Sequence, residues 1–471
     1  LQTSNFGLRG QVQNWRFRAE RLDLLGDQWQ LVNGRFTNDP FSPAGTLLSS
    51  RAAQSRQVDA DSSELTLEGS RVGLSNGLSI PLPDVQRVSE RQIRNNLFNV
   101  GIDGLDRNGF YIERTFDVIQ NDAVTFSLTP QFLVQRTIGL LSGSNALGSG
   151  VSVSSYNPLD FFGLDTKLAF RISPTTTLSG LLSQASLDPT VFDTQTRSIV
   201  DLTQQIGDSQ LLASYRYRER VFNGSLGIQT VQQSVGVQFL RNAQPLGDTG
   251  LLFGTQAGYQ QFLAQSDQAN LINQFSFGNN LVLVNRALLS GSLAYPIPLW
   301  RGEALPATAD AGLKYASTPV VPQFSFTPGL QGQLGYYSSG ETQNFWGFSG
   351  ILGLTLGNFS RDSFDYTNLS VGYTKAFVSG LSPLLFDRIV DSEVATLNLE
   401  QQIYGPWVVG FGGSLNLITA NPFNLTGSLN YRQRAYDVSL SYNFSQQLGV
   451  LSIRLNDFNW FGPGEPLEPQ S

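Results

Sequence analysis

Three arginines at alternate positions, Arg216, Arg218 and Arg220, have the residue type and spacing of a ligand site. Alternate residues of a strand point to the same face, so these side chains would lie together. Guanidinium groups bind phosphate and carboxylate oxygens through paired hydrogen bonds. The three arginines would therefore contact an anionic ligand, or they would pair with Asp and Glu residues on neighbouring strands.

The composition excludes most catalytic chemistry, because the 471 residues include no His, Cys or Met. Without His and Cys there is no Ser-His-Asp or Cys-His relay, no disulfide, and no zinc or haem site of the usual ligands. The segment 103–109 resembles a calcium loop, but Phe110 stands where an oxygen ligand is needed, so we interpret it as a turn. Carboxylate or lysine chemistry stays formally open, but no spacing supports it. We expect neither an enzyme nor a cofactor or metal.

The elements that position these residues are predicted to be strands with one apolar and one polar face. From Phe423 to Arg432 apolar and polar residues alternate, and residues 436–445 repeat the scheme, which predicts a hairpin at 433–435. The same alternation recurs upstream, and Asn108-Gly109 is typical of a tight hairpin turn. About 20 to 22 strands are predicted between residues 96 and 458.

Aromatic residues at the ends of the apolar rows favour a membrane barrel over a soluble sandwich. Phe423 and Tyr431 stand at opposite ends of one row, and Tyr436 and Phe444 at opposite ends of the next. Eight residues span about 26 Å, or roughly 20 Å along the normal of a tilted strand, comparable to a lipid-facing band between aromatic girdles. No run of 18 apolar residues encodes a membrane helix, so a membrane protein of this sequence would be a closed barrel.

Charge density divides the chain near Arg94. Residues 1–95 contain 11 Arg and 10 acidic residues, whereas the other 376 residues carry the whole negative balance of the chain. The short alternating pieces before residue 95 predict a charged β unit, either the end of a larger domain or a unit that packs on another part. Its aromatic and aliphatic residues line an apolar groove or form an ordinary core; they are Trp15, Phe17, Trp29 and Leu31.

Several strings resemble the LPS-assembly outer-membrane proteins, the LptD (OstA-like) family, particularly its cyanobacterial branch. They are Trp29–Leu31 with Arg35–Pro40, then Leu78–Pro83 before the barrel, and Asp457-Phe458 after the last hairpin. Asp39 stands where many members of that family have Cys. Since the chain has no Cys, the disulfides of the proteobacterial members are absent, and any connection between the two domains would be non-covalent.

The resemblance implies an all-β protein in the outer membrane with its N-terminal part in the periplasm. Residues 1–95 would be the end of a periplasmic β-jelly roll, and 96–471 a transmembrane antiparallel barrel of about 20–26 strands. The groove would receive lipopolysaccharide from a periplasmic bridge protein of the LptA type. The barrel would release its acyl chains into the outer-membrane lipids between the first and last strands, while the sugar passes Arg216, Arg218 and Arg220 in the lumen. A plug lipoprotein is a possible further partner, and no nucleic acid is expected.

Pro130 is the candidate for a weakened seam, because proline cannot donate to a strand ladder. The alternative is that it lies at a strand end or bulge. Two other functions remain open: a porin or exporter channel with a periplasmic domain, for which residues 141–155 could form a constriction loop, and a structural anchor between envelope layers.

Overall fold

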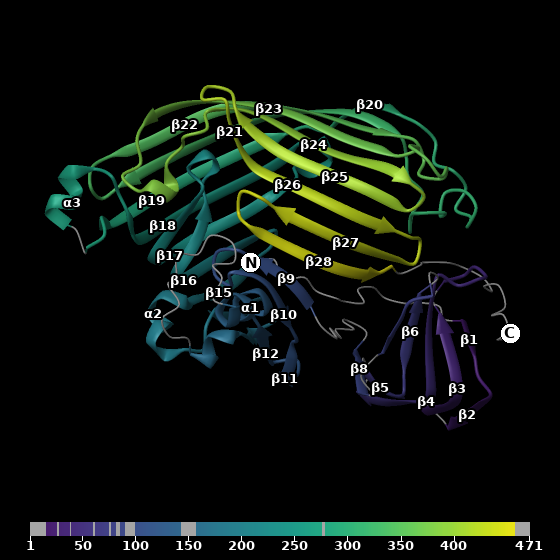
Figure 1. Cartoon of the computed structure of the whole chain (residues 1–471). Coiled ribbons are helices and arrows are strands. Elements are labelled where there is room, and N and C mark those ends of the chain that lie inside the picture. The colour runs from purple at the N-terminus through teal and green to yellow at the C-terminus, as the bar shows by residue number, and fades with distance from the viewer. Residues whose placement is uncertain are drawn as a thin grey trace.

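The computed structural model describes residues 16–25, 28–37, 39–59, 62–74, 77–81, 85–89, 99–142, 157–275 and 278–456. It contains an eight-stranded antiparallel sheet followed by a closed antiparallel barrel (Figure 1). Among the described helices, none has the length and apolar character needed to cross a membrane.

The N-terminal sheet has eight strands. Its strands are β1 (Arg16–Arg18), β2 (Arg21–Leu25), β3 (Gln28–Thr37), β4 (Thr46–Asp59), β5 (Ser62–Glu68), β6 (Arg71–Leu74), β7 (Ser79–Pro81) and β8 (Val85–Ser89). The order is β1-β3-β4-β5-β8, with β2 also on β3, β6 also on β4, and β7 on β6. Leu31, Ala53 and Leu67 lie opposite one another on β3, β4 and β5 and form the core of the sheet. Whether this sheet is part of a jelly roll stays a prediction.

Twenty strand segments form the barrel. The first half comprises β9 (Asn99–Asp103), β10 (Gly109–Glu113), β11 (Phe116–Gln120), β12 (Val124–Phe132), β13 (Phe162–Ser173), β14 (Thr176–Gln184), β15 (Thr196–Ile206), β16 (Ser209–Phe222), β17 (Ile228–Pro245) and β18 (Leu252–Gln265). The second half comprises β19 (Leu281–Ala294), β20 (Ile297–Arg301), β21 (Gln323–Tyr337), β22 (Thr342–Leu356), β23 (Thr367–Gly380), β24 (Glu393–Tyr404), β25 (Trp407–Asn416), β26 (Asn421–Arg432), β27 (Tyr436–Asn443) and β28 (Leu448–Leu455). The helices of the connections are α1 (Val134–Ser142), α2 (Phe192–Gln195) and α3 (Ala269–Phe275), with the 3-10 turns η1 (Pro158–Phe161), η2 (Pro189–Val191), η3 (Gly224–Leu226), η4 (Gly247–Thr249) and η5 (Leu385–Asp387).

The ring itself has 18 strands, because two of them are interrupted. β10 and β11 pair with successive parts of β12, and β19 and β20 pair with successive parts of β21, so these four segments occupy two positions. Pro296 lies in the second break, where it offers no N–H to the ladder. The predicted barrel is confirmed, and the predicted number of strands matches the number of strand segments. The ring has fewer strands than segments, because alternation alone cannot distinguish a break within a strand from a turn.

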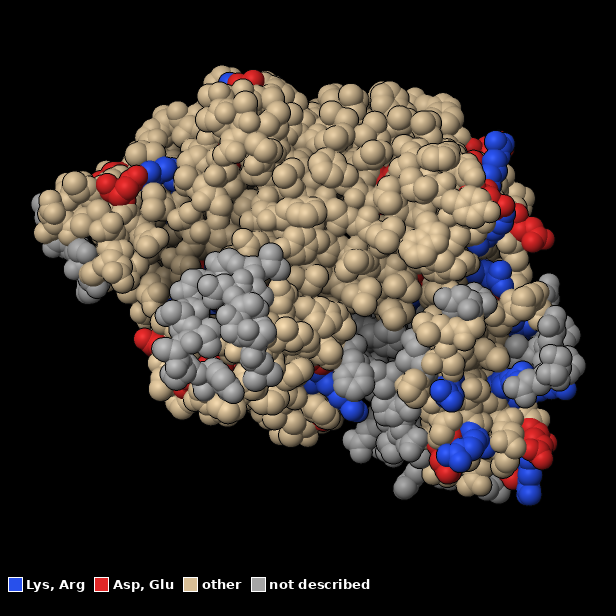
Figure 2. Space-filling model, viewed as in Figure 1, with Lys and Arg blue, Asp and Glu red and all other residues tan. Residues whose placement is uncertain are grey.

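The outside of the barrel is apolar, as a hydrocarbon environment requires. Large hydrophobic side chains such as Phe170, Val237, Leu330 and Val371 are exposed there. In Figure 2 the broad face over β21 to β26 carries almost no charged residues, and charges gather at the two ends and on the N-terminal sheet. Exposed aromatic side chains stand towards both ends: Tyr295, Trp300, Tyr404 and Trp407 near one, and Tyr336, Trp346, Phe377 and Phe444 near the other. A closed barrel with such an exterior is an outer-membrane-type barrel.

The two ends of the barrel differ in their connections. At the end beside the N-terminal sheet, here the sheet end, most turns are short, for example 121–123, 174–175 and 433–435, although 302–322 and 357–366 are longer. At the opposite end, here the loop end, the connections include 133–161 and 381–392. Bacterial barrels usually have short periplasmic turns and long extracellular loops.

Two aromatic residues expected in the lipid-facing girdles are placed elsewhere. Tyr436 is fully buried, because the N-terminal sheet covers it. Phe423 lies opposite Ser414 after a register shift beside Asn424, whose φ is 53°, and this shift turns the ring to the lumen side. The girdle prediction is therefore wrong for these two residues, whereas Phe444 is exposed as expected.

Candidate functional site: the barrel seam and the N-terminal sheet

The ring closes through a short strand pair. β28 pairs with β9 over four residues, from Leu448 opposite Asp103 to Leu451 opposite Val100. The neighbouring pair, β27 with β28, extends over eight residues. One further bond, from Gly104 N–H to Gln447 O (2.9 Å), continues the closure at the loop end. We call the β9–β28 pair the seam.

The described pairing of the seam ends before the N-terminal sheet. Residues 452–455 of β28 have no partner on the β9 side among the residues that the structure describes. Their only strand neighbour in those ranges is β27. A strand edge with unpaired backbone groups is costly in lipid and ready to pair or separate. Within the described ranges, the seam is therefore paired at its loop end, and no pairing is described at its sheet end.

Pro130 does not belong to the seam. It lies in β12, opposite Leu164 of β13, and its carbonyl accepts a hydrogen bond from Arg114 N–H (3.3 Å). β12 is the third strand of the ring, beside the break between β10 and β11. Pro130 thus lies in one of the first barrel strands but outside the closing pair, and its missing N–H affects pairing near that break. That this weakens the seam stays a prediction.

An apolar path leads from the N-terminal sheet to the barrel. Leu48 packs on the core of the sheet and also on Val72, which contacts Ala435 and Tyr436 at the turn between β26 and β27. The two apolar clusters therefore share the side chain of Leu48 and form one continuous apolar path there. Tyr436 begins β27, the strand that pairs with the unpaired half of β28.

Of the four residues proposed to line a groove, the structure describes the side chain of Leu31 alone. Leu31 is 2% exposed in the core of the sheet and so faces its apolar side. Trp15 lies outside the described residues, and so do the side chains of Phe17 and Trp29. The groove prediction stays open for these three.

A buried ion pair fastens the sheet to the barrel. Arg434, in the turn between β26 and β27, donates from Nε to Asp39 Oδ2 (2.9 Å) and from a terminal nitrogen to Pro43 O (2.6 Å). Asp39 is fully buried, and it also accepts from the backbone N–H groups of Phe41 (3.0 Å) and Gly45 (2.7 Å). The contact is non-covalent, and it lies at Asp39, where many members of the LptD family that the sequence resembles have Cys.

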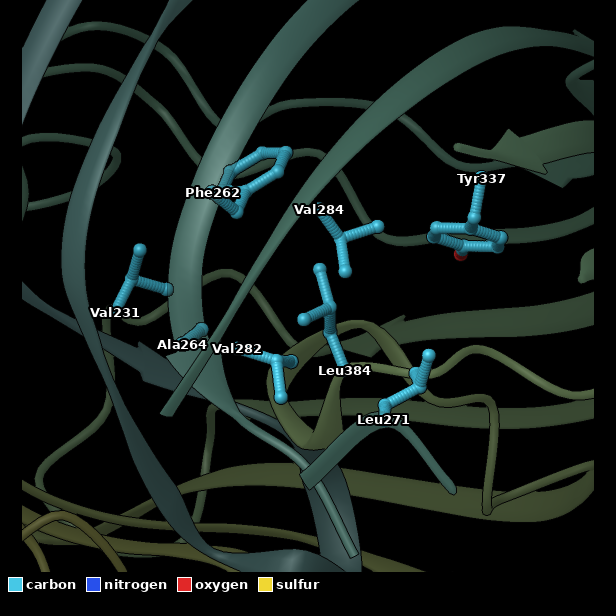
Figure 3. Packing of buried hydrophobic residues seen from close by; sticks show 8 residues of the cluster. All are labelled: Val231, Phe262, Ala264, Leu271, Val282, Val284, Tyr337 and Leu384. Carbon is cyan, nitrogen blue, oxygen red and sulfur yellow. The ribbon is translucent and has the colours of Figure 1, made fainter. Parts of the chain in front are cut away.

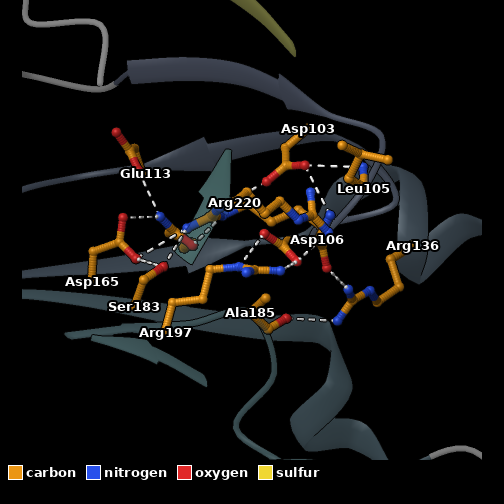
Figure 4. Close-up of polar contacts among 12 residues, drawn as sticks. Asp103, Leu105, Asp106, Glu113, Arg136, Asp165, Ser183, Ala185, Arg197 and Arg220 are labelled. Atoms are coloured by element: carbon orange, nitrogen blue, oxygen red, sulfur yellow. Dashed lines mark hydrogen bonds and ion pairs between the residues drawn. The ribbon is translucent and has the colours of Figure 1, made fainter. Parts of the chain in front are cut away.

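A polar network fixes the other side of the seam inside the lumen (Figure 4). Arg107, in the turn after β9, is 1% exposed; it contacts Asp103 (2.9 Å), Asp165 (3.0 Å) and Gln131 (2.7 Å). Gln131 in turn donates to Glu113 on β10 (2.8 Å). The network joins β9 and β10 to β12 and β13 by side chains as well as by backbone.

Asp106 extends this network to β15 and β16. Arg197 binds its carboxylate through two hydrogen bonds of 2.8 Å, and Arg220 adds a third of 2.6 Å. Burial alone would raise the pKa of Asp106, but the hydrogen bonds and charge of Arg197, with Arg220, hold that pKa below its ordinary value.

The three candidate arginines are engaged by the protein itself. Arg220 pairs with Asp106, and Arg216 pairs with Asp201 (3.1 Å). Arg218 donates to Thr194 O, and its φ of 52° breaks the strand alternation. Of the two interpretations, pairing within the barrel describes these side chains, and the shared face expected from their spacing is lost at Arg218.

A loop folded into the loop end narrows the lumen. Residues 381–392 carry Asp387, which pairs with Arg286 on β19 and accepts a hydrogen bond from Tyr337 on β21. Asn223, in the turn after β16, donates to Leu385 O (2.8 Å) and Arg388 O (2.9 Å). Figure 3 shows Leu384 of this loop among inward residues of β17, β18 and β19, together with Leu271 of α3. The loop is thus tied to the wall by polar and apolar contacts.

Within the described residues, the loop 381–392 lies inside the loop end of the barrel. Residues 143–156 lie outside the described ranges, so the constriction-loop prediction for that segment is untested. Within the described residues, no group of three or more His, Cys, Asp and Glu could hold a metal ion.

A family model described as "Protein of unknown function (DUF3769)" matches residues 9–459. The chain belongs to this family. No curated protein matches the chain. Among solved structures it is similar to OmpTdeltaL8, a loop L8 deletion mutant of OmpT, an outer membrane protein of Vibrio cholerae. The identity is 6%, the match covers 75% of this chain and 91% of that chain, and the TM-score is 0.26.

Sequence reasoning missed most of the residues that join the parts of this DUF3769 chain. Asp106 and Arg107 lie in the segment 103–109, which the sequence marked only as a turn, and Asp387 lies in a loop with no motif. The one signal was Asp39, which departs from the resembling family's Cys and therefore marked the contact between the domains. The partner, Arg434, lies 395 residues away.

Proposed function

We propose that this protein is an outer-membrane lipopolysaccharide transport protein that delivers the lipid to the outer leaflet through the seam. The N-terminal sheet would lie in the periplasm and the loop end of the barrel would face outward. The chain would move lipid without reacting with it, so its role is not enzymatic.

One observation carries the proposal: an apolar path that ends beside an incompletely paired seam. The core of the N-terminal sheet continues through Leu48 and Val72 to Tyr436, and β27 supports the half of β28 that lacks a described partner. An amphiphile crosses an aqueous compartment without exposing its acyl chains only when an apolar groove meets an opening into lipid.

The seam suits such an opening. Separating β9 from β28 breaks the four residue pairs and the Gly104 bond, whereas separating β27 from β28 breaks eight pairs. Because the Arg107 network fixes β9 and β10 to the wall, the movable side is the hairpin of β27 and β28. Acyl chains would pass between the strands while the sugar stays in the polar lumen.

Four partners follow from this proposal. Lipopolysaccharide would be the cargo, and the surrounding outer-membrane lipids would receive it. A bridge protein of the LptA type would extend the N-terminal sheet in the periplasm by pairing with an edge strand, and a plug lipoprotein could occupy the lumen.

Depletion in the native host tests the proposal. We expect loss of surface lipopolysaccharide with accumulation in the periplasm, measured by surface labelling and membrane fractionation. Unchanged surface lipid together with lost uptake of small solutes would contradict lipid export.

Unchanged surface lipid with lost solute uptake would favour a channel function. One observation supports that function. The loop 381–392 narrows the lumen as a constriction loop does. Its Asp387 pairs with Arg286 of β19, and its Arg388 pairs with Asp267. In that function the N-terminal sheet would be a periplasmic accessory.

A further inference from the structure

A charged pair lies on the lipid-facing side of the barrel. Lys375 of β23 and Glu393 of β24 are directly opposite each other and form an ion pair. The same row of the ladder contains Leu293, Leu330 and Phe348, which are exposed on the outer face. Residues opposite one another in a row share a face, so Lys375 and Glu393 point outward.

The pair lies towards the loop end, where β24 begins. Its neighbours are aromatic: Trp346 stacks on Phe377 at 4.4 Å, and the Tyr373 hydroxyl donates to Glu393 Oε1 (2.9 Å). A charge facing the middle of the hydrocarbon is strongly destabilising, and one near the interface much less so. The aromatic surroundings mark the interface, where lipid headgroups lie.

An apolar groove begins at the same residues. It has a volume of 680 Å³ and is lined almost entirely by apolar atoms. Its upper wall is Phe348 and Tyr373, its floor includes Gly350, and it crosses the strands to Tyr295 beside the break in β19–β20. The groove therefore runs from the charged pair across the hydrocarbon band towards the sheet end.

We propose that this outer face binds one outer-leaflet lipopolysaccharide molecule, with an acyl chain in the groove and a phosphorylated sugar on Lys375, Glu393 and Tyr373. The ammonium complements phosphate, and the carboxylate and phenol complement sugar hydroxyls. The site rests on the orientation proposed above, with the loop end outward, but it needs neither the seam nor lipid export.

The full-length protein in vesicles tests this site. Wild type and variants are reconstituted with phosphatidylethanolamine, with or without lipopolysaccharide, and are then extracted in mild detergent. Native mass spectrometry counts the lipid that stays bound. Lys375→Gln removes the cation. Gly350→Val fills the groove, since a Cβ there meets the Phe326 ring at 3.1 Å. Gly180→Val is the matched control, because its Cβ would have no neighbour nearer than 4.0 Å and its row partner Leu168 faces outward.

We expect the wild type and Gly180→Val to retain lipopolysaccharide, and Lys375→Gln and Gly350→Val to retain about tenfold less, as the loss of a charged hydrogen bond predicts. Heat-modifiable migration in gels checks that each variant is folded, and Lys375→Arg should retain the lipid. Equal retention by all folded variants, or retention of phosphatidylethanolamine in preference to lipopolysaccharide, would overturn the proposal. Because the readout is binding, its failure is independent of the depletion result.

Discussion

At the scale of single residues, two carboxylates hold the parts of the protein together, one fully buried and one partly buried. Asp39 joins the N-terminal sheet to Arg434, and Asp106 joins the first hairpin of the barrel to Arg197 and Arg220. Removing one member of a buried pair leaves an uncompensated charge, which is more costly than the pair is favourable.

The first prediction concerns Asp39. Asp39→Asn should weaken docking of the N-terminal sheet by about 3 kcal/mol, because Arg434 loses its buried partner. Limited proteolysis should then cleave the N-terminal part faster while the barrel resists. Asp23→Asn breaks an exposed pair with Arg21 and is the control, with an expected change of at most about 0.5 kcal/mol. Equal cleavage of Asp39→Asn and wild type would show that the ion pair does not hold the sheet.

The second prediction concerns pH. Since the folded pKa of Asp106 is lowered, its contribution to stability is complete above the ordinary value of 3.8 and is lost as the pH falls through the folded value. The thermal midpoint of Asp106→Asn should therefore lie below that of the wild type near neutral pH. The gap should shrink below about pH 4, as the ordinary pKa requires. A gap of the same size at pH 3 would contradict the assignment.

The ion-pair partners of the candidate arginines could not be found from the sequence. As arginines, Arg216 and Arg220 were predicted to bind an anionic ligand or to pair with Asp and Glu residues. The alternating pattern of the strand does not distinguish these two predictions. Asp106 lies 91 residues from Arg197 and 114 from Arg220, so only the closed ring brings them together. Arg218 was misplaced because its positive φ interrupts the alternation of side chains along β16, and its sequence context gives no sign of this.

At the scale of elements, sequence patterns predicted the hairpins, which depend on contacts between residues close in the chain. A hairpin forms at Asn108-Gly109, where both residues have positive φ values, 58° and 120°. Its loop is longer than the tight turn predicted, because it spans residues 104–108 and Gly109 already pairs with Asp103. By contrast, the inward fold of residues 381–392 depends on Arg286, about a hundred residues earlier in the chain. Such a contact leaves no periodic signal, and so the loop was not anticipated.

The third prediction tests that loop. Replacing residues 381–392 by a short glycine-serine linker should open the loop end and raise single-channel conductance in planar bilayers severalfold, because the loop no longer narrows the lumen. The milder Asp387→Asn, which leaves Arg286 without its partner, should make the conductance fluctuate. Unchanged conductance in the replaced chain would mean that another segment closes the pore.

The fourth prediction tests the apolar path. Leu48→Glu places a charge where the two apolar clusters meet and should reduce lipid delivery at least about tenfold, since an unpaired charge there repels acyl chains. Leu22→Glu, on an exposed position of β2, is the matched control. Surface lipopolysaccharide in a strain with only the variant measures the effect, and full delivery by Leu48→Glu would remove the path from the mechanism.

At the scale of the whole molecule, the different surroundings of the outer and inner faces of the barrel explain why the sequence predicted the barrel. Alternation with an apolar outer row is required by lipid outside and water inside, so the barrel and the change near residue 95 followed from composition. The number of strands and the docking of the sheet did not. Proline breaks hide strand continuity, and Tyr436 has the same sequence pattern whether lipid or the sheet covers it.

Locking the seam tests the central claim most directly. The chain has no Cys, so Ile102→Cys with Gly449→Cys forms a single engineered pair; a Cβ on Gly449 would lie 3.1 Å from that of Ile102, slightly short of the usual disulfide spacing. Leu440→Cys with Leu451→Cys, opposite each other in β27 and β28, is the control for strands that stay together. We predict that oxidation of the seam pair stops delivery of lipopolysaccharide and that reduction restores it, while the control pair has no effect. Undiminished delivery with the seam fully cross-linked would contradict the account.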